Sequence, residues 1–253
     1  MAKKITNVDA DETSTPSNDG SVFTPSAANA SKSKMYRVIA IIGWLIAIGI
    51  EIKVILRLRE VPINMNWIIG FIVGMLILVV IANILWKKAN RLDPASEKNK
   101  TKFFIQNQLG LIISVIAFLP LVVLILTNKN LSGKQKGILG SIAGAALLIA
   151  GLTGTEFNPV SQEQYAEQTA QVEGFMGGVN NVYWTKSGKS YHLYQDCGYI
   201  NSKRTTEIFQ GKVASARELK NITDICDRCA NKAKKQQVLN IGNEAEDKAE
   251  ATE

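Results

Sequence analysis

The sequence predicts an all-α membrane bundle of four helices, followed by a small α+β module and flanked by disordered N- and C-terminal tails. Four apolar segments within residues 35–153 predict the bundle, because each has roughly the 20 residues needed to cross a hydrocarbon core. The only histidine and all three cysteines of the 253-residue chain lie within residues 192–229, which predicts a separate module. The formal net charge of +7 is distributed unevenly, and its changes of sign mark the boundaries between these parts.

Residues 1–34 are rich in Ser, Thr, Asn, Ala and Asp and contain almost no large apolar side chains. Their basic and acidic residues cancel, and Pro16 and Pro25 interrupt any regular pattern. Such a segment cannot bury enough apolar surface to offset its conformational entropy, so we expect a disordered N-terminal tail. It is not a signal peptide, because the first apolar run begins only after this polar stretch.

Each apolar segment is expected to be a transmembrane helix, since a helix satisfies its own backbone polar groups within lipid. Trp67 and Trp86 lie at the two ends of the second segment, where interfacial aromatic residues are expected. The fourth segment is the shortest and consists mainly of Gly, Ala, Ile and Leu, without a charge. The expected spans are residues 36–56, 65–86, 105–127 and 137–153.

Basic residues beside the spans predict a multi-pass protein of the cell membrane with both termini in the cytoplasm. Cytoplasmic flanks carry an excess of Lys and Arg, and four spans return the chain to the side from which it started. Three cysteines suit reduced thiolates better than a disulfide framework, which points to the same side. With the N-terminus inside, the cytoplasmic flanks carry Lys32, Lys34, Arg37, Lys87, Lys88, Arg91, Lys98, Lys100 and Lys102, and the outer flanks carry Lys53, Arg57, Arg59, Lys129, Lys134 and Lys136.

The spans favour an anchor over a coupled transporter, because the last three contain no Asp, Glu, Lys, Arg or His. Glu51 and Lys53 lie in the last two turns of the first span, where snorkelling to the interface accounts for them. Pro120 should kink or locally unwind the third span. Gly70-x3-Gly74 and Gly140-x3-Gly144 permit close helix approach, and we expect packing within the bundle in preference to a homo-oligomer face.

Two acidic segments flank the module. Residues 154–181 carry a net charge of −4 and are expected to form a flexible linker, with a short polar helix from Ser161 to Phe175. Residues 239–253 also carry a net charge of −4 and are Ala-rich, so we expect a second disordered tail. The module between them, residues 182–238, has a net charge of +6.

Short aromatic and β-branched runs predict an α+β fold for the module. Residues 182–185 and 190–193 should form a hairpin, because Ser187-Gly188 between them is a turn signal. A third strand is expected at residues 205–209. Short helices are expected at residues 216–220, after the capping-box pattern Ser215-x2-Glu218, and at residues 230–238.

The candidate metal ligands are His192, Cys197, Cys226 and Cys229, spaced as His-x4-Cys and Cys-x2-Cys. One His and three Cys complete a closed tetrahedral site for one structural Zn²⁺. We expect His192 on a strand, Cys197 in the following turn, and the last two cysteines at the start of a helix, whose positive end favours thiolates. So small a unit should draw much of its folding free energy from the metal. The predicted fold class is therefore a bundle of four transmembrane helices followed by a small α+β zinc-binding domain.

Two other interpretations of these four residues are disfavoured. A surface histidine beside packed thiols would not explain why every ligand-type His and Cys of the chain falls in one motif. A thioredoxin-like redox Cys-x2-Cys would need a βαβ context, which the surrounding sequence lacks.

The stretch from Val182 to Cys197, followed by Ile225 to Cys229, resembles small bacterial zinc modules of treble-clef type, which are similar in plan to the metal-binding domain of the Ada DNA-repair protein. In the Ada domain four cysteines hold zinc, and the first accepts methyl groups from damaged phosphates. His192 stands at that position here, so the resemblance implies metal binding without the acceptor thiolate. The whole chain also resembles uncharacterised bacterial multi-pass membrane proteins, which adds no function.

Three functions are compatible with these features. We favour a non-enzymatic membrane protein whose zinc module has a binding or scaffold role, because a closed site leaves no position for substrate. Its partners would be the lipid bilayer and a protein or a second copy, with no catalytic residues and no small-molecule substrate. A zinc-dependent enzyme is the third choice, since the lone histidine is committed to metal and no acidic pair is placed as general acid and base.

The second choice is a membrane-tethered regulator that binds nucleic acid. Its basis is the set of basic residues near aromatic ones, although the same face could instead lie on anionic lipid. The basic residues are Lys186, Lys189, Lys203, Arg204, Lys212 and Arg217, and the aromatic ones are Tyr183, Trp184, Tyr191, Tyr194 and Tyr199.

Overall fold

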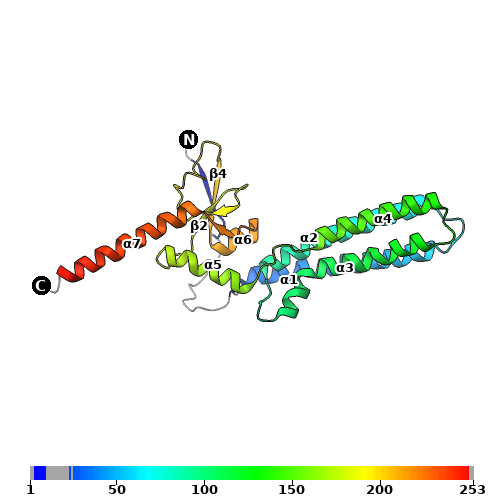
Figure 1. Cartoon of the computed structure of the whole chain (residues 1–253), viewed down its shortest axis with the longest axis horizontal. Coiled ribbons are helices and arrows are strands. Elements are labelled where there is room, and N and C mark those ends of the chain that lie inside the picture. Colours follow the sequence, from blue (N-terminus) through cyan, green and yellow to red (C-terminus); the bar gives the residue numbers. More distant parts are fainter. Residues whose placement is uncertain (1–2, 10–22, 24, 251–253) are drawn as a thin grey trace. The chain divides into compact units, whose positions relative to one another are not determined.

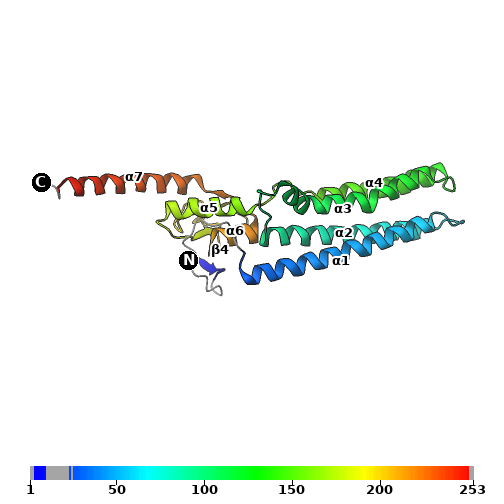
Figure 2. The same cartoon turned by 90° about the horizontal axis from the view of Figure 1, so that it is seen from below.

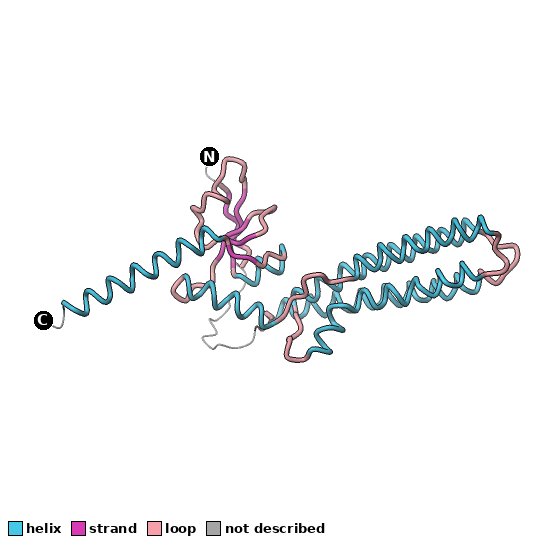
Figure 3. Tube along the Cα trace, viewed as in Figure 1, coloured by secondary structure: helices cyan, strands magenta, loops and turns pink. Residues whose placement is uncertain are grey.

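The structure, a computed structural model, describes residues 3–9, 23 and 25–250. These residues form two compact units (Figure 1). One unit runs to Ser161 and is entirely helical apart from its connections. The other joins the N-terminal residues to everything from Gln162 onward, and it contains all the described strands, as Figure 3 shows in magenta. The predicted combination of a helical bundle and a small α+β module is confirmed.

Four long helices form the first unit, and all four are long and apolar enough to cross a membrane. Consecutive helices run in opposite directions (Figure 2). The first packs mainly on the second and the third mainly on the fourth, while the second also contacts the fourth. The helices are α1 (Ala27–Arg57), α2 (Met65–Leu92), α3 (Lys100–Thr127) and α4 (Gly133–Gly154), so each predicted span lies within a longer helix.

Polar side chains fix the points where all four of these helices begin, and at α1 the Ser26 side chain accepts from the Asn29 N–H at 3.2 Å. The side-chain oxygens of Asn64, Asn99 and Ser132 each accept a hydrogen bond from a backbone N–H in the first turn of α2, α3 and α4 respectively. At α4 the Gln135 side chain also accepts from the Ser132 backbone N–H, which completes a capping box. These bonds satisfy N–H groups that a helix leaves unpaired at its start.

A buried asparagine joins all four helices of the bundle. Asn83 on α2 is fully buried, and its Oδ1 accepts from Trp44 Nε1 of α1 at 3.1 Å. Its Nδ2 donates to Ser114 Oγ of α3 and to the Ala150 carbonyl oxygen of α4, both at 3.1 Å. Because no water reaches a bilayer core to pair such groups, this network favours one arrangement of the four helices.

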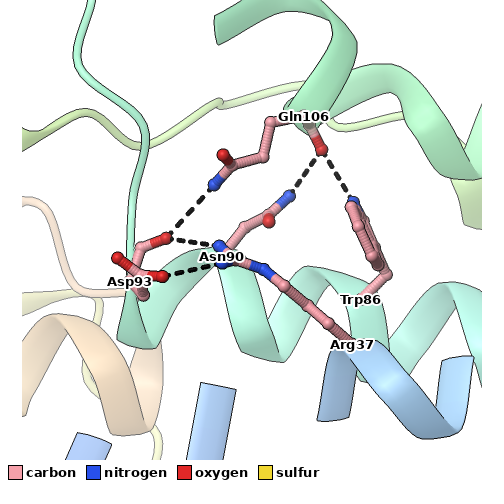
Figure 4. A network of polar contacts seen from close by, with 5 residues as sticks. All are labelled: Arg37, Trp86, Asn90, Asp93 and Gln106. Atoms are coloured by element: carbon pink, nitrogen blue, oxygen red, sulfur yellow. Dashed lines mark hydrogen bonds and ion pairs between the residues drawn. The ribbon is translucent and has the colours of Figure 1, made fainter. Parts of the chain in front are cut away.

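A second polar network lies where α2 ends and α3 begins (Figure 4). Arg37 of α1 donates to a carboxylate oxygen and to the carbonyl oxygen of Asp93, both at 2.7 Å. The carbonyl oxygen of Gln106 accepts from Trp86 Nε1 at 2.7 Å and from Asn90 Nδ2 at 2.9 Å. Gln106 Nε2 returns to the Asp93 carbonyl oxygen at 3.2 Å, so the network connects three helices.

The prediction that Glu51 snorkels to the interface is wrong. Its side chain points into the bundle and only 5% of the residue is exposed, while Oε1 has no hydrogen-bond partner among the described residues. The helical period is the reason, since Glu51 falls on the same face of α1 as the buried Ala47 and Val54. Lys53 is exposed, as expected, with Nζ 5.6 Å from the centre of the Phe71 ring.

Only one glycine of the two predicted motifs packs closely within the bundle. A Cβ at Gly70, Gly74 or Gly144 would meet nothing within 4 Å, so the prediction that Gly70-x3-Gly74 packs within the bundle is wrong. A Cβ at Gly140 would lie 2.9 Å from Leu126 Cδ2 of α3, so this glycine of the second motif does allow close packing. The backbones of α3 and α4 instead meet at Gly110 and Gly154, where a Cβ on Gly154 would lie 2.5 Å from the Gly110 carbonyl carbon. The helix α3 is continuous across Pro120.

Two small sheets form the framework of the second unit. In the first, a central strand pairs in parallel with an N-terminal strand and antiparallel with the first strand of the module. The second sheet is a parallel pair. The first sheet has the order β1 (Lys4–Asn7), β4 (Glu207–Gly211), β2 (Val182–Trp184), and the second pairs β3 (Ser190–Tyr191) with β5 (Asp224–Ile225).

Three helices complete this unit: α5 (Gln162–Phe175), α6 (Val213–Lys220) and α7 (Asp227–Glu250). The predicted helix at 161–175 corresponds to α5, but α5 is not part of a free linker. It contacts α6 and α7, and its Tyr165 and Val172 are fully buried. The last helix continues to Glu250, beyond the point where a disordered tail was expected.

The structure also differs from the prediction at both ends of residues 1–34. Lys4–Asn7 form a strand and Ala27 begins a helix. Pro16 and most of the stretch between them lie outside the described residues. Local composition missed the strand because its partner, β4, is about 200 positions away in sequence, as the separation of 201 between Thr6 and Glu207 illustrates.

Candidate metal centre

The predicted hairpin positions His192. Tyr183 and His192 exchange two backbone hydrogen bonds, with N–O distances of 2.8 and 2.7 Å. The turn between the strands is closed by a bond from the Gly188 N–H to the Thr185 carbonyl oxygen at 3.2 Å. The imidazole therefore projects from a strand whose backbone is fixed on both sides of the turn.

Cys197 lies in the turn that follows, as predicted. Its N–H donates to the Tyr194 carbonyl oxygen at 3.2 Å, and its own carbonyl oxygen accepts from Ile200 and Asn201 at 3.0 and 2.8 Å. These bonds fold the chain back so that the thiol faces the histidine side of the hairpin. Cys197 is 7% exposed.

The other two cysteines are delivered by the parallel β3–β5 pair and the start of α7. The Cys226 N–H donates to the Tyr191 carbonyl oxygen at 2.9 Å, which places Cys226 beside the strand that precedes His192. The Cys226 carbonyl oxygen accepts from Ala230 at 3.0 Å, so Cys226 directly precedes the first turn and Cys229 lies within it. The positive end of the helix is thus directed at two sulfur atoms.

The structure brings all four predicted residues together. One ligand atom from each of His192, Cys197, Cys226 and Cys229 lies within 4.8 Å of the others, and all four residues are buried. The Cys229 Sγ is 3.8 Å from His192 Nδ1. Two ligands at the usual zinc–sulfur and zinc–nitrogen distances of a tetrahedral site lie about 3.5 Å apart, so this spacing fits a metal ion between them. Within the described part of the chain, no second cluster of His, Cys, Asp and Glu has this geometry.

Burial shifts the pKa of two of the four ligands. Desolvation raises the pKa of the Cys229 thiol to about 12, an effect opposed by hydrogen bonds from the backbone of Tyr194 and Leu193. Burial also lowers the pKa of His192, which favours the neutral imidazole that can bind a metal through a ring nitrogen. A cation that binds here therefore displaces thiol protons. Its bonds to the ligand atoms offset the free-energy cost of burying these polar groups.

The ligands are part of a larger apolar core than the sequence suggested. Trp184, Tyr191, Leu193 and Ile208 are almost completely buried around the cluster, and Val172 of α5 joins them. The metal is therefore not the only source of stability. The module was expected to have little apolar core of its own, and its core is larger than that. The prediction left out α5, which lies outside the motif and contributes Val172 to this core.

Arg217 is buried between α5 and α6 and does not belong to an exposed basic face. It is 3% exposed, donates to Gln168 Oε1 at 2.6 Å and Gln164 Oε1 at 2.8 Å, and stacks 4.7 Å from the Tyr165 ring centre. The predicted basic set thus loses one member. Lys186, Lys189, Lys203 and Arg204 are exposed, and Lys212 is partly exposed.

The sequence identified the ligands but missed Asp9, which supports the module from the N-terminus. Its carboxylate accepts hydrogen bonds from the Lys212 N–H and from Ser215 Oγ at the start of α6. The expected capping box from Ser215 is not what starts this helix, since Lys212 occupies the N-cap position without a side-chain cap of its own. Only the β-branched residues Ile5, Thr6 and Val8 offered a weak strand signal, since such side chains favour strands.

Comparison with known proteins adds no family. No protein-family model, no curated protein and no solved structure matches this chain. The functional argument therefore rests on the four buried ligands and on the four helices able to span a membrane.

Proposed function

We propose that this chain is an integral membrane protein that holds a structural-zinc module at the cytoplasmic face, with a binding or scaffold role and no catalysis. The four helices serve as the anchor. The module then supplies the recognition surface, and the metal fixes its shape. Its likeness to Ada-like zinc modules agrees with this role, because His192 replaces the reactive cysteine.

The convergence of four buried protein ligands on one point is the observation that carries this proposal. Structural zinc sites are filled by four protein ligands, whereas catalytic sites keep an open position for water or substrate. Three thiolates and one imidazole favour zinc over the hard cations magnesium and calcium, which prefer oxygen ligands. The burial of each ligand further argues against access by a substrate.

Three features together support a cytoplasmic location for the module. The β1–β4 pairing puts the N-terminal strand and the module in one unit, so an even number of spans between them is required. The three cysteines form no disulfide, as expected for thiols in a reducing compartment. The excess of basic residues on the flanks nearest the termini agrees with this orientation.

Metal analysis of the full chain in detergent tests the proposal. We expect about one zinc ion per chain, in keeping with a single four-ligand site. Cys229→Ser should lose the zinc and expose the module to proteolysis, because a metal site contributes to folding. The exposed Asn201→Ser in the same module is the control and should keep the metal. A metal-free chain with a protease-resistant module would contradict a structural zinc.

Nucleic-acid binding remains the second candidate because an exposed aromatic side chain lies close in the sequence to exposed basic side chains. Tyr199 is 69% exposed, and Lys203 and Arg204 follow it closely in the chain. Fluorescence anisotropy with labelled single- and double-stranded DNA would detect such binding, which should weaken as salt is added. A Lys203→Glu/Arg204→Glu variant should weaken it further. No binding by the zinc-loaded chain at low salt would end this candidate.

A further inference from the structure

The N-terminal segment, residues 3–9, occupies an edge of the module's central strand. Lys4 to Asn7 of β1 pair in parallel with Glu207 to Gln210 of β4. The ladder continues beyond the strand, since the Val8 N–H donates to the Gln210 carbonyl oxygen at 2.9 Å. The other edge of β4 is covered by β2. The segment therefore sits where extended peptides join a sheet in proteins that bind by strand addition.

A carboxylate anchors the end of this segment. Asp9 accepts from the backbone N–H of Lys212 and from the hydroxyl of Ser215, so it caps α6 from another part of the chain. The helix begins without a side-chain cap of its own. The Val213 N–H at the same helix start donates to Asn180 Oδ1 at 3.0 Å, so Asp9 shares the capping of α6 with Asn180, and the helix dipole favours its negative charge.

Gly211 leaves the space that Val8 and Asp9, the end of this segment, occupy. We call this space the seat. A Cβ built at Gly211 would lie 2.7 Å from Val8 Cγ2 and 2.8 Å from Asp9 Oδ2, and the three nearest atoms all belong to the segment. The missing side chain thus leaves room for the segment, whereas no other part of the module approaches as closely. A side chain at Gly211 would therefore clash first with Val8 and Asp9 of the segment.

The segment is held mainly by backbone and polar contacts. Ile5 is 41% exposed, Thr6 Oγ1 donates to Glu207 at 2.7 Å, and only Val8 packs against the module's apolar core. Such an attachment buries little apolar area, so its free energy is small compared with that of a core strand. A small free energy permits exchange with a competing peptide.

We propose that the β4 edge and the start of α6 form a peptide-binding site, and that residues 3–9 occupy it as an intramolecular ligand. Its external ligand is an extended segment of a partner protein with the pattern of Val8 and Asp9, an apolar residue followed directly by an acidic one. The proposal rests on the binding role of the module and names its partner class. The tether raises the local concentration of the intramolecular ligand, so an external peptide must compete with it.

A labelled peptide with the sequence of residues 3–9 tests this site on the full chain in detergent. Asp9→Ala in the protein removes the acceptor that caps α6 and so weakens the intramolecular ligand, and the peptide should bind this variant about tenfold more tightly than the unaltered chain, as expected for loss of a helix cap. The same change at an exposed carboxylate of the module, Asp224→Ala, should leave peptide affinity unchanged. A peptide with Ala in place of its aspartate should bind the Asp9→Ala chain about tenfold more weakly.

Gly211→Val separates the site from non-specific binding, because its side chain fills the seat and should abolish peptide binding. Equal peptide binding to all variants, or undiminished binding to Gly211→Val, would overturn the proposal. Zinc content is measured on every sample. If zinc-loaded chains do not bind the peptide, the peptide-binding site alone is refuted. If the unaltered chain contains no zinc, the proposed function is refuted.

Discussion

Arg217 shows how one buried charge can hold two helices together. A guanidinium removed from water needs several hydrogen bonds to offset its desolvation. Here Gln164 and Gln168, one helical turn apart on α5, accept from its two terminal nitrogens, and the Tyr165 ring covers its face. Gln168 also donates to the Thr223 carbonyl oxygen at 2.7 Å, which links α5 to the loop before β5. Gln168 on α5 therefore contacts both Arg217 of α6 and the loop before the strand that precedes Cys226.

Replacing Arg217 with methionine should destabilise the module by about 2 kcal/mol, because two charge-assisted hydrogen bonds are lost and two glutamines lose their partner. Thermal unfolding of the zinc-loaded chain would measure this change. The exposed Arg204→Met is the control and should change stability by less than about 0.5 kcal/mol. An equal effect at both positions would show that Arg217 does not hold α5 in place.

At the scale of elements, the α3–α4 crossing shows why paired glycines alone did not locate the closest helix contact. Gly110 and Gly154 lie on different helices, and each is paired on its own helix with a small residue other than glycine, in Gly110-x3-Ser114 and Ala150-x3-Gly154. Their contact lies close to the Ser114–Ala150 bond of 3.0 Å, so tight backbone approach and the buried polar network occur together. Small residues at a membrane-helix contact allow this approach.

Gly154→Ala should loosen this crossing and destabilise the bundle by about 1–3 kcal/mol, because the new Cβ would overlap the Gly110 backbone. Gly144→Ala makes the same chemical change where nothing lies within 4 Å. It should be neutral or slightly stabilising, since alanine is the better helix former. Unfolding in detergent, followed by circular dichroism, compares the two. Similar losses in both variants would contradict the close contact.

At the scale of the whole molecule, the chain divides into two units with different sources of stability. The bundle depends on apolar side chains and a central asparagine, whereas the module combines an apolar core with four metal-ligand residues. The chain passes from one unit to the other at two places, before α1 and after α4. The metal ligands all belong to the module, so loss of metal should lower the stability of the module and leave that of the bundle unchanged.

A strong chelator should increase hydrogen exchange in residues 182–238 and leave exchange in α1 to α4 unchanged. The reason is that unpaired buried thiols and an imidazole destabilise the module once the metal is gone. Mass spectrometry of the full chain in detergent can follow both units in one sample, with chelator already saturated by zinc as the control. Increased exchange throughout the bundle would show that the units are energetically coupled.

The spans and the ligands could be read from the sequence because both are local patterns. A long apolar run and a His-x4-Cys or Cys-x2-Cys spacing carry their meaning within a few turns of chain. Arg217, Asp9 and Gly154 could not be assigned in this way. Each acts through a partner on another element, so only tertiary structure shows that the arginine is buried, the aspartate caps a helix and the glycine touches a backbone.

Glu51 illustrates a different limit. Its position near the end of an apolar run was compatible with an interfacial side chain, but the face of α1 on which it lies is determined by the packing of the bundle. Hydropathy gives depth along a helix and says little about rotation around its axis. The position of Glu51 along the span could therefore be predicted from the sequence, but not the side of the helix on which its side chain lies.

The β1–β4 pairing also has a consequence for biosynthesis. Lys4–Asn7 emerge from the ribosome before any of the four spans, and β4 emerges after all of them. In the proposed topology the sheet can close only when an even number of the intervening helices has entered the bilayer, because an odd number would leave the two strands on opposite sides. Closure of this sheet would thus distinguish a fully inserted chain from one that had skipped a single helix, and the latter would expose an unpaired β4 edge to the quality-control machinery of the cell.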